Sequence, residues 1–87
     1  MPRYFFHRTD GGFSPDTEGT ELPDIGVARI EAARYAGATM QERPNDVWDG
    51  RDLRVEVTDD GGRLLCTVVV IGIDGGSMRE APSRSRP

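Results

Sequence analysis

Residues 24–44 have the sequence DIGVARIEAARYAGATMQERP, and this stretch decides the fold. Asp24 suits a helix N-cap, because its carboxylate can accept hydrogen bonds from the unpaired N–H groups of the first turn. Pro44 disfavours the α conformation at Arg43, so the helix should end near Glu42. Apolar residues recur at helical spacing along it and define the face that we expect to pack on a sheet: Ile25, Ala28, Ala32, Tyr35, Ala36 and Met40.

Two segments with strand character precede this helix. Residues 2–8 (PRYFFHR) are rich in aromatic side chains, which favour a half-buried strand, and the sequence DGG at residues 10–12 predicts a turn after it. A second, irregular strand should lie within residues 12–22. Because Pro15 and Gly19 interrupt it, we expect it at an edge of the sheet, with a bend or a bulge.

Two further strands follow the helix. Residues 53–58 alternate between apolar and polar side chains, and the sequence DDGG at residues 59–62 predicts a hairpin turn. In residues 63–73, apolar side chains occur at both odd and even positions, which is typical of a strand covered on both faces. We expect the first and last strands to be central because they are the most apolar. The prediction is an α+β domain of ββαββ order: a four-stranded antiparallel sheet with one helix packed on one face.

The composition changes after the last strand. We expect residues 1–73 to form a single domain and residues 74–87 (DGGSMREAPSRSRP) to be disordered, because they hold too few apolar residues to offset the entropy of ordering. Residues 1–74 contain eight Arg against fourteen Asp or Glu, a net charge near −6. An acidic domain repels phosphate backbones, which argues against nucleic acid as a partner.

Size and cysteine content limit the ways in which this domain can be stabilised. A chain of 87 residues is small for a single hydrophobic core. Cys66 is the only cysteine and His7 the only histidine, so neither an internal disulfide nor an ordinary Cys/His zinc site can form. Oligomerisation is the remaining common source of stability. No apolar run reaches the roughly 18–20 residues of a membrane span, and the N-terminus lacks a signal-peptide pattern, so we expect no membrane contact and a cytoplasmic location.

We find no pattern that indicates catalytic, cofactor-binding or metal-binding residues, and we expect a protein that is not an enzyme and has no cofactor. A His7–Cys66 pair would require the first and last strands to be neighbours and the thiol to be activated. The simpler interpretation is that Cys66 is a small core residue. Asp46, Asp49 and Asp52 recur every three residues, but this spacing matches no EF-hand loop, and solvated loop carboxylates account for it.

Four motifs occur together in this chain: PRYFFH at residues 2–7, DTEGTELPD at 16–24, ARIEA at 28–32 and LRVEVTDDG at 53–61. Their combination resembles a family of short bacterial proteins of unassigned function, and the resemblance covers roughly residues 2–71. It implies a self-contained domain and no particular activity. A looser pattern, in which a short hairpin leads into an Ala/Glu-rich helix, is similar to antitoxins of HicB type.

We therefore expect a small non-enzymatic interaction or regulatory module that acts as a homo-oligomer, most simply a homodimer, or that binds another protein. The alternative is a nucleic-acid-associated regulator of antitoxin type. A concentrated patch of Arg3, Arg8 and Arg54 would favour that alternative.

The homodimer is predicted because the sequence has more apolar surface than one helix on one sheet can cover. A helix on a sheet needs an apolar stripe a little over 100° wide, and residues 25–40 offer about twice that. The last strand carries apolar side chains on a second face as well. The surplus defines the candidate interface residues: Gly26, Ile30, Ala33 and Gly37 on the helix, and Leu65, Val69 and Ile71 on the last strand. The alternative is that the loops 9–22 and 43–52, with Trp48, fold over this surplus.

Overall fold

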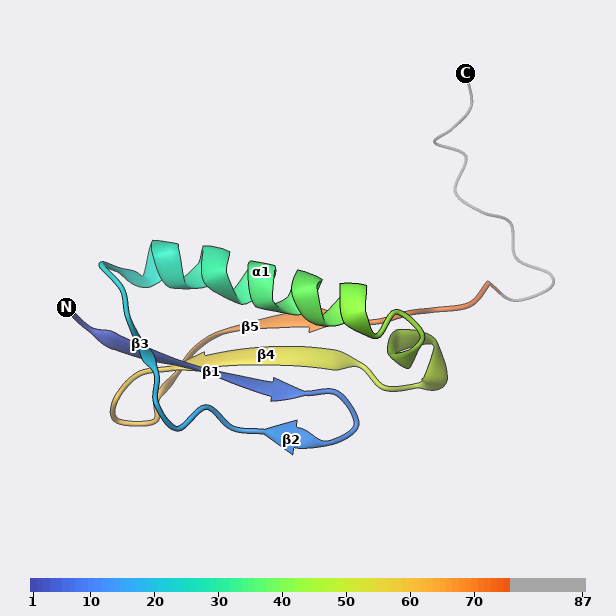
Figure 1. Ribbon diagram of the computed structural model, residues 1–87, viewed down its shortest axis with the longest axis horizontal. Helices are drawn as coiled ribbons and strands as arrows, with labels where there is room; N and C mark the ends of the chain where they lie inside the picture. The colour runs from blue at the N-terminus through green and yellow to red at the C-terminus, as the bar shows by residue number, and fades with distance from the viewer. Residues whose placement is uncertain (76–87) are drawn as a thin grey trace, which may run out of the picture.

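The structure is a computed structural model that describes residues 1–75. Within these residues an antiparallel sheet is covered on one face by a long helix (Figure 1). The elements, in chain order, are β1 Arg3–Thr9, β2 Phe13–Ser14, β3 Thr20–Glu21, α1 Ile25–Glu42, the 3-10 helix η1 Asp46–Asp49, β4 Leu53–Thr58 and β5 Leu64–Val70. The predicted α+β class and ββαββ order are confirmed, with the irregular second strand divided into β2 and β3.

The sheet has the order β2-β1-β4-β5, and β3 pairs with β1 on the same side as β2. β2 pairs with the end of β1 at Arg8 and Thr9, whereas β3 pairs with its beginning at Arg3 and Tyr4. β2 and β3 therefore form one broken edge, as the interrupting Pro15 and Gly19 predict. β1 and β4 are the central strands.

The sequence signals at both ends of α1 are confirmed. The N–H of Val27 donates to Oδ1 of the N-cap Asp24 over 3.0 Å. At the other end, the helix stops at Glu42, and Arg43 leaves the α conformation before Pro44. The intervening residues keep one small-residue face along the whole length of the helix.

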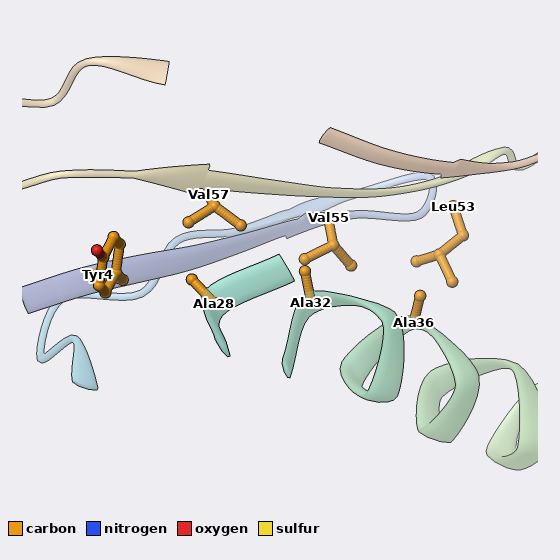
Figure 2. Packing of buried hydrophobic residues seen from close by; sticks show 7 residues of the cluster. All are labelled: Tyr4, Ala28, Ala32, Ala36, Leu53, Val55 and Val57. Carbon is orange, nitrogen blue, oxygen red and sulfur yellow. The ribbon is translucent and has the colours of Figure 1, made fainter. Parts of the chain in front are cut away.

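This small-residue face meets β4 directly. Ala28, Ala32 and Ala36 of α1 are buried against three side chains of β4 (Figure 2): Leu53, Val55 and Val57. Because alanine side chains are short, the helix backbone lies close to the sheet, over β4 and β5. Tyr4 and Phe6 of β1 complete the core beside the helix.

The last strand is not central, and that prediction is wrong. Within residues 1–75, β5 pairs with β4 alone and forms the second edge of the sheet. Its apolar residues occur at both parities because Cys66, Val68 and Val70 pack toward the core while Leu64 and Val69 are exposed on the open face of the sheet. A strand that is apolar on both faces is here covered on one face only.

The prediction that Leu65 faces away from the core is also wrong. A register shift between Val57 and Thr58 pairs Thr58 with Leu64, while Cys66 pairs with Val57. The extra residue in β5 exchanges the faces expected at this end of the strand. Leu65 consequently packs against the core cluster, and Leu64 takes the exposed position.

The expected disordered segment, residues 74–87, falls mostly outside the described residues, which end at Gly75. Among residues 1–75, no helix combines the length and the apolar character needed to cross a membrane.

Candidate functional site

The edge formed by β5 is the most unusual surface of the domain. Its seven residues, LLCTVVV, include no charged residue and no proline. Exposed edge strands are normally short, charged or interrupted, because their unpaired N–H and C=O groups otherwise pair with any other strand. In the part of the chain that the structure describes, nothing pairs with the outer side of β5. β5 is therefore a ready template for one more strand.

Exposed apolar side chains accompany this edge. Val69 is 45% exposed on the open face, and Leu64 at the start of β5 is 54% exposed. Ile71, directly after the strand, is exposed as well. Of the candidate interface residues on the last strand, the structure thus places Val69 and Ile71 at the surface and Leu65 against the core.

The helix adds a second uncovered strip next to β5. Glu31 and Tyr35 of α1 face the β2/β3 side of the sheet, where they line a cleft with residues of that edge. At 100° per residue, Gly26, Ala33 and Gly37 lie on the other side of the helix, roughly 100–140° from the line of buried alanines, and the exposed Arg29 lies between them and the sheet. Gly26, Ala33 and Gly37 are exposed, and so is Ile30, which lies farther from the sheet on the same side. We call these four residues and the edge of β5, together with the exposed Arg29 between them, the β5 flank.

The loops do not cover this surplus. Trp48 of η1 is 56% exposed, and it reaches only the end of β5. A Cβ atom at Gly72 would lie 2.9 Å from Cε3 of Trp48 and 2.9 Å from the carbonyl oxygen of Val47, so the chain passes tightly against η1 at this point. Phe13, in the other loop, is exposed next to His7 on the open face. The β5 flank stays uncovered.

The opposite edge of the sheet depends on Asp16, which the sequence analysis did not single out. Its Oδ2 accepts a hydrogen bond of 3.1 Å from the N–H of Phe6, in the gap between β2 and β3. Its Oδ1 accepts bonds of 3.0 Å from the N–H groups of Glu18 and Gly19. The carboxylate thus accepts the hydrogen bond that the N–H of Phe6 would otherwise donate to a neighbouring strand. The signal in the sequence was the aspartate after Pro15 and three residues before Gly19, which adopts φ +73°.

The environment of Asp16 keeps it ionised. Burial alone would raise the pKa of its carboxyl group, but the hydrogen bonds from the N–H groups of Gly19, Phe6 and Glu18 outweigh burial and lower the pKa below its ordinary value. The edge therefore holds a fixed negative charge.

His7 has a structural position in the same region. The N–H of Asp16 donates to Nδ1 of His7 over 3.1 Å, so Nδ1 carries a lone pair and the ring proton sits on Nε2. Nε2 in turn lies 2.9 Å from Oγ1 of Thr58 on β4. Both ring nitrogens are thus engaged in tying the edge loop to the sheet.

His7 and Cys66 do not meet. His7 pairs with Glu56 and faces the open side of the sheet, whereas Cys66 pairs with Val57 and packs toward the core. β4 separates their two strands. The geometry brings no acid, base or nucleophile together at this pair.

The three arginines that would favour nucleic-acid binding are dispersed. Arg8 lies on the helix side of β1, with its guanidinium 5.8 Å from the ring centroid of Tyr35. Arg54 pairs with Thr9 at one end of β1, while Arg3, at the other end, forms a 3.1 Å ion pair with Glu21. They form no common patch. Among the described residues, no group of three or more His, Cys, Asp or Glu side chains is placed to hold a metal ion.

A family model described as Domain of unknown function (DUF6894) matches residues 3–71. No curated protein and no solved structure matches the chain significantly.

Proposed function

The chain belongs to the family described as Domain of unknown function (DUF6894), and we propose that it acts as a non-enzymatic interaction module that forms a homodimer through the β5 flank. The observation that carries this proposal is the bare, uncharged, seven-residue edge of β5. An edge strand of this kind pairs with another strand through its main-chain groups. In the dimer, β5 of each copy lies antiparallel to β5 of the other and the two sheets become one.

A two-fold contact of this kind is self-complementary. Antiparallel pairing centred on the middle of Leu64–Val70 places Thr67 opposite Thr67 of the second copy. It also brings the two α1 helices together, because α1 lies over β4 and β5. If each helix axis lies midway between these two strands, the axes are separated by about two strand spacings, or about 10 Å, which is a distance at which helices pack.

Three small residues and one arginine, Arg29, lie on the facing helix flanks. Gly26, Ala33 and Gly37 carry at most a methyl group and leave room for a second helix. No other part of the domain explains Gly37, since a Cβ atom there would meet nothing within 4 Å. Each helical glycine costs about 1 kcal/mol relative to alanine, which a close helix contact in the dimer would offset.

The expected contact is large enough for a specific dimer. The strand edge is about 24 Å long for seven residues. Together with the helix flank we estimate that it buries roughly 600 Å² per copy, about 1,200 Å² in total, which is the lower end of the range for specific interfaces. Burial of this size also suits a small domain whose single core is limited.

The open face of the sheet is a weaker candidate for the contact. It carries Arg54, Glu56, Thr58 and Thr67 between its apolar residues, which is the mixed pattern of a solvated antiparallel face. The β5 edge, in contrast, carries no charged residue. We also propose a cytoplasmic location, which suits the free thiol of Cys66.

Sedimentation equilibrium of the full chain tests the proposal. The wild type should sediment as a dimer at tens of micromolar, and Thr67→Lys should sediment as a 9.6 kDa monomer. Within one copy, the new lysine faces Glu56 on β4, so the fold keeps a favourable pair. Between copies, two lysines meet at the two-fold axis and repel.

The control is Thr17→Lys, which makes the same change at an exposed position of the opposite edge. It should leave the dimer intact. A wild-type chain that stays monomeric at all concentrations contradicts the proposal, and so does a dimer that survives Thr67→Lys.

A further inference from the structure

A cleft of about 480 Å³ lies between α1 and the β2/β3 edge, on the far side of the domain from the β5 flank. Its volume falls within the range of small-molecule sites, roughly 300–1,000 Å³. Its lining includes four apolar residues, Phe6, Pro15, Leu22 and Tyr35, and two acidic ones, Asp16 and Glu31. Nothing in the dimer contact requires this combination.

The apolar part of the cleft contains two aromatic rings from different elements. Phe6 comes from the central strand β1, and Tyr35 comes from the middle of α1. Both are only partly buried, although they pack against the core cluster. Aromatic faces attract cations through their quadrupole, and the guanidinium of Arg8 already lies over the Tyr35 ring.

The charged part of the cleft is negative on both walls. Asp16 belongs to the edge loop, and Glu31 belongs to the helix. The cleft lining includes no arginine. Three backbone N–H groups fix the carboxylate of Asp16, and its Oδ2 accepts only one of the three bonds, so this oxygen keeps capacity for a further donor. Glu31 meets only the exposed guanidinium of Arg34, through Oε2 at 3.2 Å.

We propose that this cleft binds a small organic cation: an amine or guanidinium group carried on an apolar chain. The cationic group lies between Asp16 and Glu31 and donates hydrogen bonds to their carboxylates. The apolar chain lies against Phe6, Leu22 and Tyr35. Charge complementarity selects cations over anions, and the aromatic rings select an apolar chain over a simple hydrated ion.

A titration of the ¹⁵N-labelled full chain followed by NMR tests this inference. The probe is 2-phenylethylamine, and the matched neutral probe is 2-phenylethanol, which has the same shape without the charge. The amine should cause saturable shifts at the amides of Phe6, Asp16, Gly19 and Tyr35 and bind at least about fivefold more tightly than the alcohol. Added salt should weaken its binding, because the cleft is partly exposed.

Glu31→Gln removes one charge from a partly exposed turn of the helix, and the amide oxygen of the glutamine can still accept the hydrogen bond from Arg34. It should weaken amine binding about fivefold, as expected for one partly exposed charge pair. Glu42→Gln makes the same change at the end of α1, outside the cleft, and should not alter binding.

Three results would overturn the inference: equal binding of amine and alcohol, shifts that map elsewhere on the domain, or unchanged affinity in Glu31→Gln. Binding of an arginine-containing peptide without binding of the free amine would also overturn it, since the site would then recognise a protein segment. The dimer test is independent, because Thr67→Lys changes the opposite edge and leaves the cleft unaltered.

Discussion

The two edges of the sheet differ in how they treat their unpaired backbone groups. At one edge, β2 and β3 contribute only two residues each, and the gap between them is closed by the carboxylate of Asp16. At the other edge, β5 presents seven uncharged residues, with one extra residue at the register shift near Leu65. One edge is protected against further pairing and the other is not. The difference supports the proposal that the exposed edge pairs with another strand.

Three residues protect the β2/β3 edge against pairing with a further strand. Pro15 removes one donor, Gly19 turns the chain with a positive φ, and Asp16 satisfies three N–H groups. A Cβ atom at Gly19 would lie 2.8 Å from side-chain atoms of Arg3 and Phe5, so the loop is packed tightly on β1. β5 has none of these features. Substitutions made separately at each edge test this difference.

The largest effect on stability should come from Asp16→Ala. Three N–H groups lose their acceptor, and that of Phe6 is partly buried, so we expect a loss of about 2 kcal/mol in the free energy of unfolding. Urea denaturation measures it, with Thr17→Ala at the exposed neighbouring position as the control. A loss below about 0.5 kcal/mol would show that Asp16 does not hold this edge.

The next effect concerns self-association. In the proposed dimer, Ala33→Glu places a charged side chain on the helix flank next to the second copy, and it should raise the dimer dissociation constant at least about tenfold, or about 1.4 kcal/mol. Ala38→Glu is the matched control, because it is the same change on the other flank of the same helix. Equal effects of the two variants in sedimentation would remove the helix from the contact.

A smaller effect is expected for the monomer at Gly37. Because a Cβ atom there meets nothing within 4 Å, Gly37→Ala should raise the free energy of unfolding by somewhat under 1 kcal/mol. The measurement uses urea denaturation in the Thr67→Lys background, where the dimer does not contribute. Ala38→Gly, the reverse change at the next residue, should lower stability by a similar amount. A destabilising Gly37→Ala would reveal a contact within one copy that requires the glycine.

The smallest effect is a pH dependence at the protected edge. The pKa of Asp16 is lower in the folded chain than the ordinary value of 3.8, so its charge stabilises the fold above that value. This contribution is lost as the pH falls through the lower folded pKa. The difference in unfolding free energy between wild type and Asp16→Asn should therefore shrink below pH 3.8. A difference that grows on acidification would mean that the pKa is raised.

The sequence predicted the local structure better than the arrangement of the strands. Asp24 and Pro44 define α1 because capping and proline effects act within a few residues. The order of the strands depends on pairing between distant segments, and an apolar pattern does not show which segments pair. The central position expected for the last strand was wrong for this reason.

Two features of the candidate sites could likewise not be predicted from the sequence. The register shift near Val57 and Thr58 exchanges Leu64 and Leu65 between faces, and no sequence signal marks it. Asp16 did have a signal in its neighbours Pro15 and Gly19. Its function became apparent only when β2 and β3 were found to leave the N–H of Phe6 between them. The helix flank of Gly26, Ile30, Ala33 and Gly37, in contrast, follows from helical periodicity and is exposed as expected.

Amide hydrogen exchange at two protein concentrations tests the central claim most directly. The account predicts that exchange in residues 64–70 slows when the protein concentration rises above the dimer dissociation constant, because the outer N–H groups of β5 gain partners. Residues 13–21 should exchange at the same rate at both concentrations, since Asp16 protects their edge within one copy. Exchange in β5 that does not change with concentration would contradict the account.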